Sequence, residues 1–184
     1  MARWVFEPGH TSAEFRVRHM MVTFVRGAFK NVQGSIEFDP ANPGASRVEA
    51  TIDAKSIWTG DPDRDGHLRS ADFLEVENHP QITFNGSQVE VIGDHDFRVR
   101  GDLTIKGITR EAMLKVRYLG QWDTPWWEDG QDKGPKRRAG FVAKAQINRH
   151  DFGVSWDAPL ERGGSTVGSI LQLTIDAEAI LEDE

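Results

Sequence analysis

The chain contains no cysteine among its 184 residues, which excludes a disulfide framework and a thiol nucleophile. Basic residues are in the minority, with 22 Lys and Arg against 29 Asp and Glu and a formal net charge of −7. This balance argues against a nucleic-acid partner, because phosphate binding needs a basic face. No apolar run approaches the ~20 residues of a membrane-spanning helix. The N-terminus lacks a basic region followed by an apolar core, so we expect a cytoplasmic protein without a secretory signal.

Catalytic and cofactor motifs are also missing from the sequence. There is no G-x-S-x-G motif, no nucleotide-binding glycine pattern and no H-E-x-x-H zinc motif, and the six histidines are scattered. Carboxylates are abundant, but no pair stands out as a general acid and base. We therefore predict no catalytic residue and no cofactor, and an enzyme acting on a lipid remains an alternative.

What the sequence does contain is alternation of polar and apolar residues with turns between the runs. Such a period of two indicates strands with one buried face, seen for example at 13–19, 48–54 and 171–179. We count eight to ten short strands, which predicts an all-β fold and one domain over residues 1–184. Several inward positions are alanines, and about eight strands can enclose a cavity for one slender ligand. We therefore favour an extended antiparallel barrel of about eight strands, with a sandwich around a solid core as the alternative.

The connection 61–80 is the one segment that does not alternate, and we expect a short helix around 67–76 at the end of the barrel. It nearly fits the calcium-loop pattern D-x-[DN]-x-[DN]-G-x₅-E, with oxygen ligands from Asp61, Asp63, Asp65 and Asp72. The simpler interpretation is that Asp63 or Asp65 caps the helix. A calcium-binding module therefore stays an alternative, and we predict no metal.

The segment 122–138 carries three tryptophans beside acidic and basic residues. Aromatic rings next to cations could make transient contact with a membrane surface. The local charges nearly cancel, however, which favours a long hairpin loop that folds over the barrel with its tryptophans packed.

Seven short motifs occur in a fixed order along the chain: VRHMMV (17–22), VRGAF (25–29), IDAKSI (52–57), RDGHLRSADFL (64–74), HPQITF (79–84), GDLTIKGIT (101–109) and INRHDFG (147–153). Together they resemble the YceI family of lipid-binding proteins. The resemblance implies a lipocalin-like barrel, a long isoprenoid or fatty lipid in its lumen, frequent homodimers and no established catalytic role. Many relatives are exported, and the segment 122–138 has no counterpart in the family pattern.

We expect the ligand to be held by burial of its apolar chain, at roughly 0.8 kcal/mol per methylene before costs are subtracted. Five polar residues are candidates for the head-group end: His19, Arg26, Arg64, His67 and Arg149. The candidate lining residues are apolar and come from nearly every strand: Phe15, Val17, Met20, Met21, Phe24, Phe29, Ile36, Phe38, Ile52, Leu68, Phe73, Ile82, Phe84, Leu103, Ile105, Leu114, Phe141 and Phe152.

Overall fold

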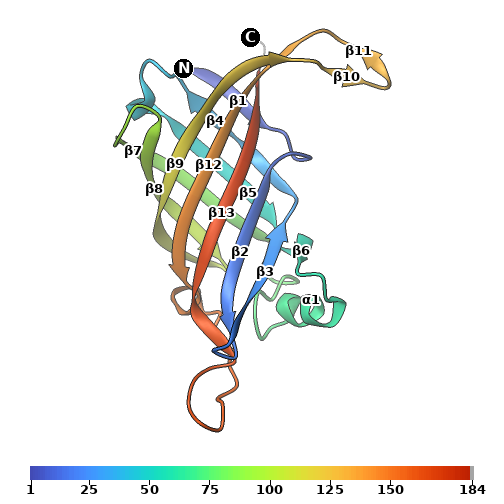
Figure 1. Cartoon of the computed structure of the whole chain (residues 1–184), viewed down its shortest axis with the longest axis vertical. Helices are drawn as coiled ribbons and strands as arrows, with labels where there is room; N and C mark the ends of the chain where they lie inside the picture. Colours follow the sequence, from blue (N-terminus) through green and yellow to red (C-terminus); the bar gives the residue numbers. More distant parts are fainter. Residues whose placement is uncertain (183–184) are drawn as a thin grey trace.

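The computed structural model describes residues 1–182 and has one large antiparallel sheet, so the predicted all-β class is confirmed. The sheet closes on itself because β13 pairs with β12 on one side and with both β1 and β2 on the other (Figure 1). Its strands are β1 (Ala2–Phe6), β2 (Ser12–His19), β3 (Thr23–Phe29), β4 (Val32–Phe38), β5 (Arg47–Asp53), β6 (Ile57–Trp58), β7 (Gln81–Val91), β8 (Asp96–Ile105), β9 (Ile108–Thr124), β12 (Lys136–Asn148) and β13 (Val167–Leu181).

The barrel has eight strand positions around its circumference, because β1 and β2 share one position and β3 and β4 share another. β1 and β2 both lie along β13, β1 at Ala179–Leu181 and β2 at 167–176. β4 and β3 follow next to them, since β1 pairs with β4 and β2 pairs with β3. β5, β7, β8, β9 and β12 complete the circle. The result is the predicted eight-stranded barrel, in which every neighbour is antiparallel.

The strands are longer than the short strands we predicted, with 17 residues in β9 and 15 in β13. Alternation of polar and apolar residues indicates a strand only where one face of the strand is apolar. β9 and β12 continue as a pair beyond the barrel with both faces largely polar, so their full length was not predicted. The hairpin β10 (Trp127–Glu128) and β11 (Gln131–Asp132) connects their ends.

The segment 122–138 therefore projects from the top of the barrel in Figure 1 and does not fold over it. Trp122 and Trp127 are exposed, so the prediction that these tryptophans pack is wrong for both. Trp126 is half-buried beneath the guanidinium of Arg138, whose Cζ lies 5.3 Å from the ring centroid.

The one α-helix among residues 1–182, α1 (Pro62–Arg69), begins five residues earlier than the predicted 67–76. Its start is fixed by Asp61, whose side chain accepts hydrogen bonds from the amide N–H groups of Asp63 and Arg64, both at 3.1 Å, with Pro62 as the first helical residue. The helix ends at Ser70, and turns lead from there to β7. No helix among residues 1–182 is long and apolar enough to cross a membrane.

Two clusters of buried side chains occupy the barrel. The upper cluster lies at the end that holds both chain termini in Figure 1, and the lower cluster lies at the end covered by α1. The upper cluster consists of Trp4, Phe6, Phe38, Phe97, Tyr118, Ala139, Phe141 and Ala179. The lower cluster consists of Ala54, Phe73, Val76, Ile82, Phe84, Val99, Leu103, Ile105, Ala112, Phe152 and Val154.

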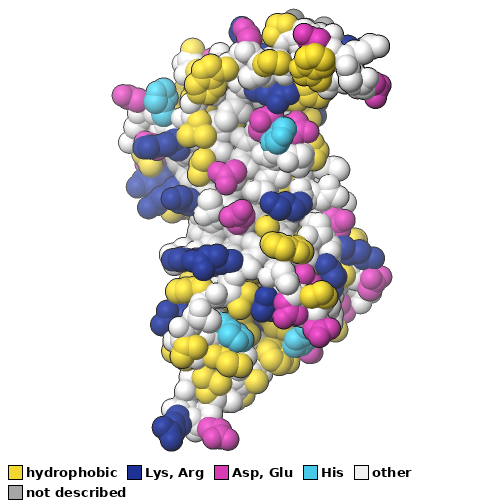
Figure 2. Space-filling view, turned by 45° about the vertical axis from the view of Figure 1, so that its right-hand side comes forward, with side chains coloured by type: hydrophobic (Ala, Val, Ile, Leu, Met, Phe, Trp, Pro, Cys, Tyr) yellow, Lys and Arg dark blue, Asp and Glu magenta, His cyan; other side chains and the backbone are white. Residues whose placement is uncertain are grey.

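Exposed hydrophobic side chains also collect at the two ends, as Figure 2 shows for one face of the molecule, while charged side chains are spread over the middle. At the upper end they include Leu119, Trp122 and Trp127. At the lower end they include Met20, Met21 and Val22 in the turn between β2 and β3.

Candidate functional site

An apolar cavity of about 280 Å³ lies inside the barrel. Val48, Ala50, Val89 and Val116 pack against both clusters yet remain only partly buried. These four side chains line the cavity, which explains their partial exposure in the middle of a barrel. The core is therefore not solid, and the sandwich alternative with side chains meeting across the centre is excluded.

Small residues make the room for this cavity. Ala50, Ala112, Ala143, Ala145 and Ala177 all belong to its lining, where larger side chains would fill the lumen. Ala179, another inward-facing alanine of β13, does not line the cavity and is fully buried in the upper cluster.

Gly27 makes room in a different way. A Cβ atom on Gly27 would lie 2.4 Å from the ring of Phe15, so only glycine lets this ring lie across β3. Phe15 itself lines the cavity, and its ring centroid lies 6.0 Å from that of Phe29.

Most of the predicted lining residues do face the cavity. They include one residue of α1, Leu68, and one of the turns that follow it, Phe73. The predicted residues that line the cavity are Phe15, Val17, Phe29, Ile36, Phe38, Ile52, Leu68, Phe73, Ile82, Phe84, Leu103, Ile105, Leu114, Phe141 and Phe152.

Three predicted lining residues lie elsewhere. Phe24 has the opposite strand parity to Phe29 and lies on the outer face, beneath the guanidinium groups of Arg16 and Arg18. Met20 and Met21 are exposed in the turn after β2, both with positive φ, of 45° and 63°. The prediction that these three side chains point into the cavity is therefore wrong.

Three predicted head-group residues do not face the cavity either. Arg26 lies on the outer face, in an open groove with Arg16, Lys115 and Lys144. Arg64 donates hydrogen bonds to the hydroxyl and carbonyl oxygens of Thr59, at 2.7 and 3.0 Å. His19, at the end of β2, is paired with Thr23 and Val167 and is absent from the lining.

Arg149 reaches the cavity wall, but most of its guanidinium donors are bound to backbone oxygens. It donates to the backbone carbonyl oxygens of Val154, Trp156, Val167 and Gly168 at 2.8–3.1 Å. Burial lowers its pKa from the ordinary arginine value, and the nearby charge of Asp157 opposes that shift. Arg149 therefore fixes the connection between β12 and β13, and four of its five N–H donors serve that connection.

His67 lies beside the cavity without lining it. Its ring packs edge-on against Phe73 at 5.0 Å and Trp156 at 4.9 Å, between centroids. Its Nε2 lies 2.8 Å from a carboxylate oxygen of Asp72. These contacts connect α1 to the loop after β12 and close the lower end of the barrel.

The four aspartates of the calcium-like pattern do not converge. Residues 62–69 form a helix where a calcium loop would wrap around the ion. Asp61 caps that helix, Asp72 pairs with His67, and Asp65 accepts from the amide and hydroxyl of Thr59. Within residues 1–182, the one group of three potential metal ligands is Glu7, His10 and Glu178.

The lining also contains residues that were not predicted. Val48, Val89, Phe97, Val99, Val116 and Leu173 belong to alternating runs, so the signal for them was present in the sequence. Ser46 had no such signal. It is 7% exposed, lines the cavity, and its Oγ has no hydrogen-bond partner among residues 1–182.

Fold and cavity together define an up-and-down antiparallel barrel with an apolar binding space. The model of the YceI-like domain matches residues 4–179. This chain therefore belongs to the YceI-like family.

Individual relatives agree with that assignment. Protein YceI of Escherichia coli O17:K52:H18 is 40% identical over 151 residues, which are 82% of this chain and 74% of that protein. The crystal structure of the Campylobacter jejuni YCEI protein is 27% identical, with a TM-score of 0.72 and 90% of each chain covered. A polyisoprenoid binding domain from Saccharophagus degradans shares the fold at 12% identity, with a TM-score of 0.64 over 99% of this chain and all of that domain.

Proposed function

We propose that the barrel binds one slender apolar chain, of the isoprenoid or fatty type, and carries or sequesters it. The observation that carries this proposal is the apolar cavity of about 280 Å³ inside a YceI-like barrel. A cavity lined by aliphatic and aromatic side chains stays dry and takes up apolar molecules. The Saccharophagus degradans domain of the same fold, a polyisoprenoid binding domain, supports the choice of ligand class.

The size of the cavity favours a thin ligand. Its volume lies near the lower end of ligand pockets, which span about 300–1,000 Å³. Each methylene withdrawn from water contributes roughly 0.8 kcal/mol before ordering costs. A single extended chain uses a narrow space of this kind better than a broad ring system does.

We further propose that Ser46 receives a polar atom of the ligand. Its buried hydroxyl has no partner among the described residues, and leaving such a group unpaired costs about 1–3 kcal/mol. Arg149 and Arg64 have other partners, and Arg26 lies outside, so Ser46 is the better candidate for the head-group end.

The test of the proposed function is organic extraction of the purified protein followed by mass analysis, with Ala143→Phe and Lys144→Phe as a matched pair. Ala143 faces the cavity, whereas Lys144 is its exposed neighbour on the same strand. We expect a co-purified apolar chain with wild type and Lys144→Phe, and little or none with Ala143→Phe. Equal retention by both variants, or no extractable chain from wild type, would refute binding in the lumen.

The role of Ser46 has its own test, Ser46→Ala compared with Ser56→Ala. The hydroxyl of Ser56 donates to the carbonyl oxygen of Asp53 and lies outside the lining. With the ligand-free protein, Ser46→Ala should raise stability by about 1 kcal/mol, because an unpaired buried hydroxyl is removed. With the extracted ligand it should weaken binding by about fivefold to tenfold. A variant that binds as tightly as wild type would exclude the hydrogen bond.

The same extraction distinguishes a lipid carrier from the alternative, an enzyme acting on a lipid. Incubation of the extracted chain with fresh protein leaves a carried ligand chemically unchanged, whereas an enzyme alters its mass.

Three expectations about the setting of the protein stay predictions. The homodimer is tested by light scattering during gel filtration, and the cytoplasmic location by cell fractionation. Membrane contact is tested by vesicle co-sedimentation with Trp127→Ala, because Trp122 and Trp127 are exposed on the projecting hairpin segment.

A further inference from the structure

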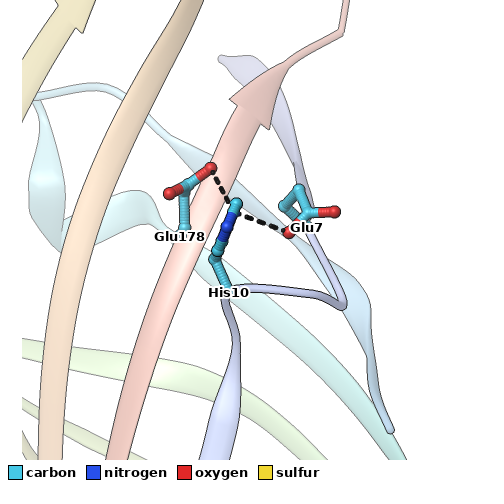
Figure 3. A group of neighbouring side chains, drawn as sticks. All are labelled: Glu7, His10 and Glu178. Atoms are coloured by element: carbon cyan, nitrogen blue, oxygen red, sulfur yellow. Dashed lines mark ion pairs between the residues drawn. The ribbon is translucent and has the colours of Figure 1, made fainter. Parts of the chain in front are cut away.

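A group of polar side chains outside the cavity lies beside β13, at the point where the pairing partner of β13 changes from β2 to β1. Glu7 follows β1, His10 belongs to the link before β2, and Glu178 lies on β13 (Figure 3). Nδ1 of His10 is 3.0 Å from Oε2 of Glu7 and 3.4 Å from Oε1 of Glu178. We propose that these three side chains form a binding site for one divalent transition-metal ion, separate from the lipid cavity.

Hydrogen bonds of the backbone hold the three residues in place. The amide of Glu7 donates to the carbonyl oxygen of Glu178 at 2.9 Å, and the amide of His10 donates to that of Glu7 at 3.1 Å. Thr11, which is buried, both donates to the carbonyl oxygen of Glu178 and accepts from its amide. Gly9 leaves room for the carboxylate, since a Cβ atom there would lie 3.1 Å from Glu7 Oε2. Such support is what keeps metal ligands oriented.

A second observation concerns the surroundings of Glu7. Its Oε2 atom is buried although the side chain is 22% exposed, and its one contact among residues 1–182 is Nδ1 of His10 at 3.0 Å. That single nitrogen also faces Glu178, so two carboxylates share one imidazole. A metal ion between Glu7, His10 and Glu178 would give both carboxylates a cationic partner.

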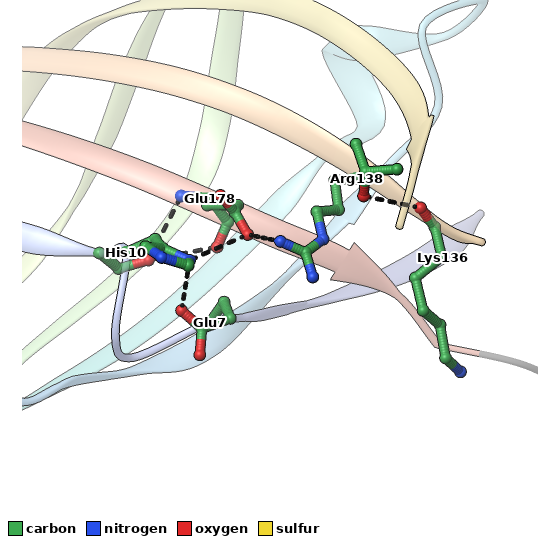
Figure 4. A network of polar contacts seen from close by, with 7 residues as sticks. Glu7, His10, Lys136, Arg138 and Glu178 are labelled. Atoms are coloured by element: carbon green, nitrogen blue, oxygen red, sulfur yellow. Dashed lines mark hydrogen bonds and ion pairs between the residues drawn. The ribbon is translucent and has the colours of Figure 1, made fainter. Parts of the chain in front are cut away.

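The basic side chain of Arg138 competes for this place. Its Nη1 lies 2.6 Å from Oε1 of Glu178, on the side away from His10 (Figure 4). A carboxylate oxygen has two lone pairs and can accept from Arg138 while it binds an ion. The positive charge of Arg138 nevertheless opposes a dication, so this residue sets the affinity of the site.

The ligand set indicates the class of metal. Imidazole nitrogen suits zinc, copper and nickel, whereas calcium and magnesium prefer oxygen ligands alone. The separations of 3.0 and 3.4 Å between Nδ1 of His10 and the two carboxylate oxygens are close to the distance of about 3.3 Å between two ligands of a tetrahedral zinc ion. All three ligand atoms lie within 4.8 Å of one another, and the exposure of His10 leaves the fourth position to water. The ion would tie the link between β1 and β2 to β13.

The experiment is calorimetric titration of the untagged full chain with zinc chloride, with calcium chloride as the comparison ion, together with thermal unfolding. We expect one zinc ion per chain, no calcium binding, and a rise in Tm on the order of 5 °C at zinc concentrations near 100 times Kd. His10→Gln and Glu7→Gln should each weaken zinc binding by at least about tenfold. His150→Gln, a change to an exposed histidine that contacts Ser169, should leave binding unchanged.

Arg138→Met makes the test sharper, because it should tighten zinc binding on the order of tenfold by removing the opposing charge. Melting without zinc shows whether each variant is folded; His10 is 63% exposed, so its replacement leaves the barrel intact. Absence of zinc binding, or equal binding by wild type and His10→Gln, would overturn the proposal and reduce the group to a cluster of salt bridges.

Discussion

The two ends of the barrel are closed by different kinds of structure. Every member of the upper cluster lies on a strand, and its rings pack closely, with 4.9 Å between the centroids of Phe38 and Tyr118. In the lower cluster, Ala54, Phe73, Val76, Phe152 and Val154 lie outside the strands. The upper closure is therefore held by the ladders of the sheet, whereas the lower closure depends on a helix, turns and a loop.

This difference predicts that the lower end is the one that opens. A segment outside the sheet can move without breaking a ladder of backbone hydrogen bonds, and such segments have the lowest local stability. Hydrogen bonds between side chains and the backbone hold the lower closure at three places: the Asp61 cap of α1, the guanidinium of Arg149 and the carboxylate of Asp157. Disrupting the upper cluster should destabilise the whole fold. Removing one of these three side chains should mainly change the local stability of the lower end and the rate at which a ligand is released.

The largest effect is expected from Phe38→Ala in the upper cluster. Phe38 is 4% exposed and contacts the rings of Phe97, Tyr118 and Phe141, so its removal leaves a cavity that the strands cannot close. We expect a loss of about 3–5 kcal/mol in the free energy of unfolding, measured by urea denaturation. Val91→Ala, at an exposed position on β7, should cost less than about 0.5 kcal/mol. A small loss with Phe38→Ala would show that ring packing in the upper cluster adds little to the stability of the fold.

Arg149→Met should have the next largest effect, about 3 kcal/mol, because four carbonyl oxygens lose their donor. Part of the loss is local, so limited proteolysis should cut the loop 153–166 sooner than any strand. Arg117→Met is the control, since Arg117 pairs with Asp96 on the surface. Unchanged protease resistance of the loop would show that Arg149 does not hold the lower closure.

Asp61→Ala should cost about 1 kcal/mol through loss of the helix cap. If α1 covers the exit, destabilising the closed state by about 1 kcal/mol raises the population of the open state about fivefold. Release of a bound fluorescent fatty acid should then become about fivefold faster. Asp63→Ala is the matched control, an exposed aspartate in the first turn of the same helix that does not cap it. Equal release rates in the two variants would place the exit elsewhere.

The upper and lower ends also differ in how much of them the sequence predicts. Alternation correctly indicated the barrel and most of its lining, because a strand with one buried face repeats every two residues. It failed where the chain leaves that rule: Phe24 was given the parity of Phe29, and Met20 and Met21 were placed inward although they form a turn. The parity also changes between Phe29 and Val32, both of which line the cavity, because the chain bends between β3 and β4.

The polar residues were predicted less well, because their roles depend on contacts between distant segments. Arg149 is bound to carbonyl oxygens up to 19 positions away, and the start of α1 depends on which of several aspartates acts as the cap. His10 and Glu178 are 168 positions apart and meet only because β13 closes the barrel. No local pattern could have placed Ser46 in the wall with an unpaired hydroxyl.

The smallest effect concerns pH and is confined to the lower end. Burial raises the pKa of the Asp157 carboxyl, but hydrogen bonds from Val167, Ser165, Ala158 and Thr166 outweigh it, so the pKa lies below the ordinary 3.8.

The depressed pKa gives the sign of the effect. Because the carboxyl has the lower pKa in the folded state, its stabilisation of the loop 153–166 is complete well above pH 3.8 and is lost as the pH falls through the folded-state value. Hydrogen exchange of the loop amides, in particular Thr166 and Val167, should therefore gain protection from pH 3 to pH 5 after correction for intrinsic exchange. Asp157→Asn keeps an acceptor oxygen but cannot titrate, so protection in this variant should not change over that range. A parallel change in both proteins would assign the transition to another group, such as Asp96 or Asp123, whose pKa values their arginine partners also lower.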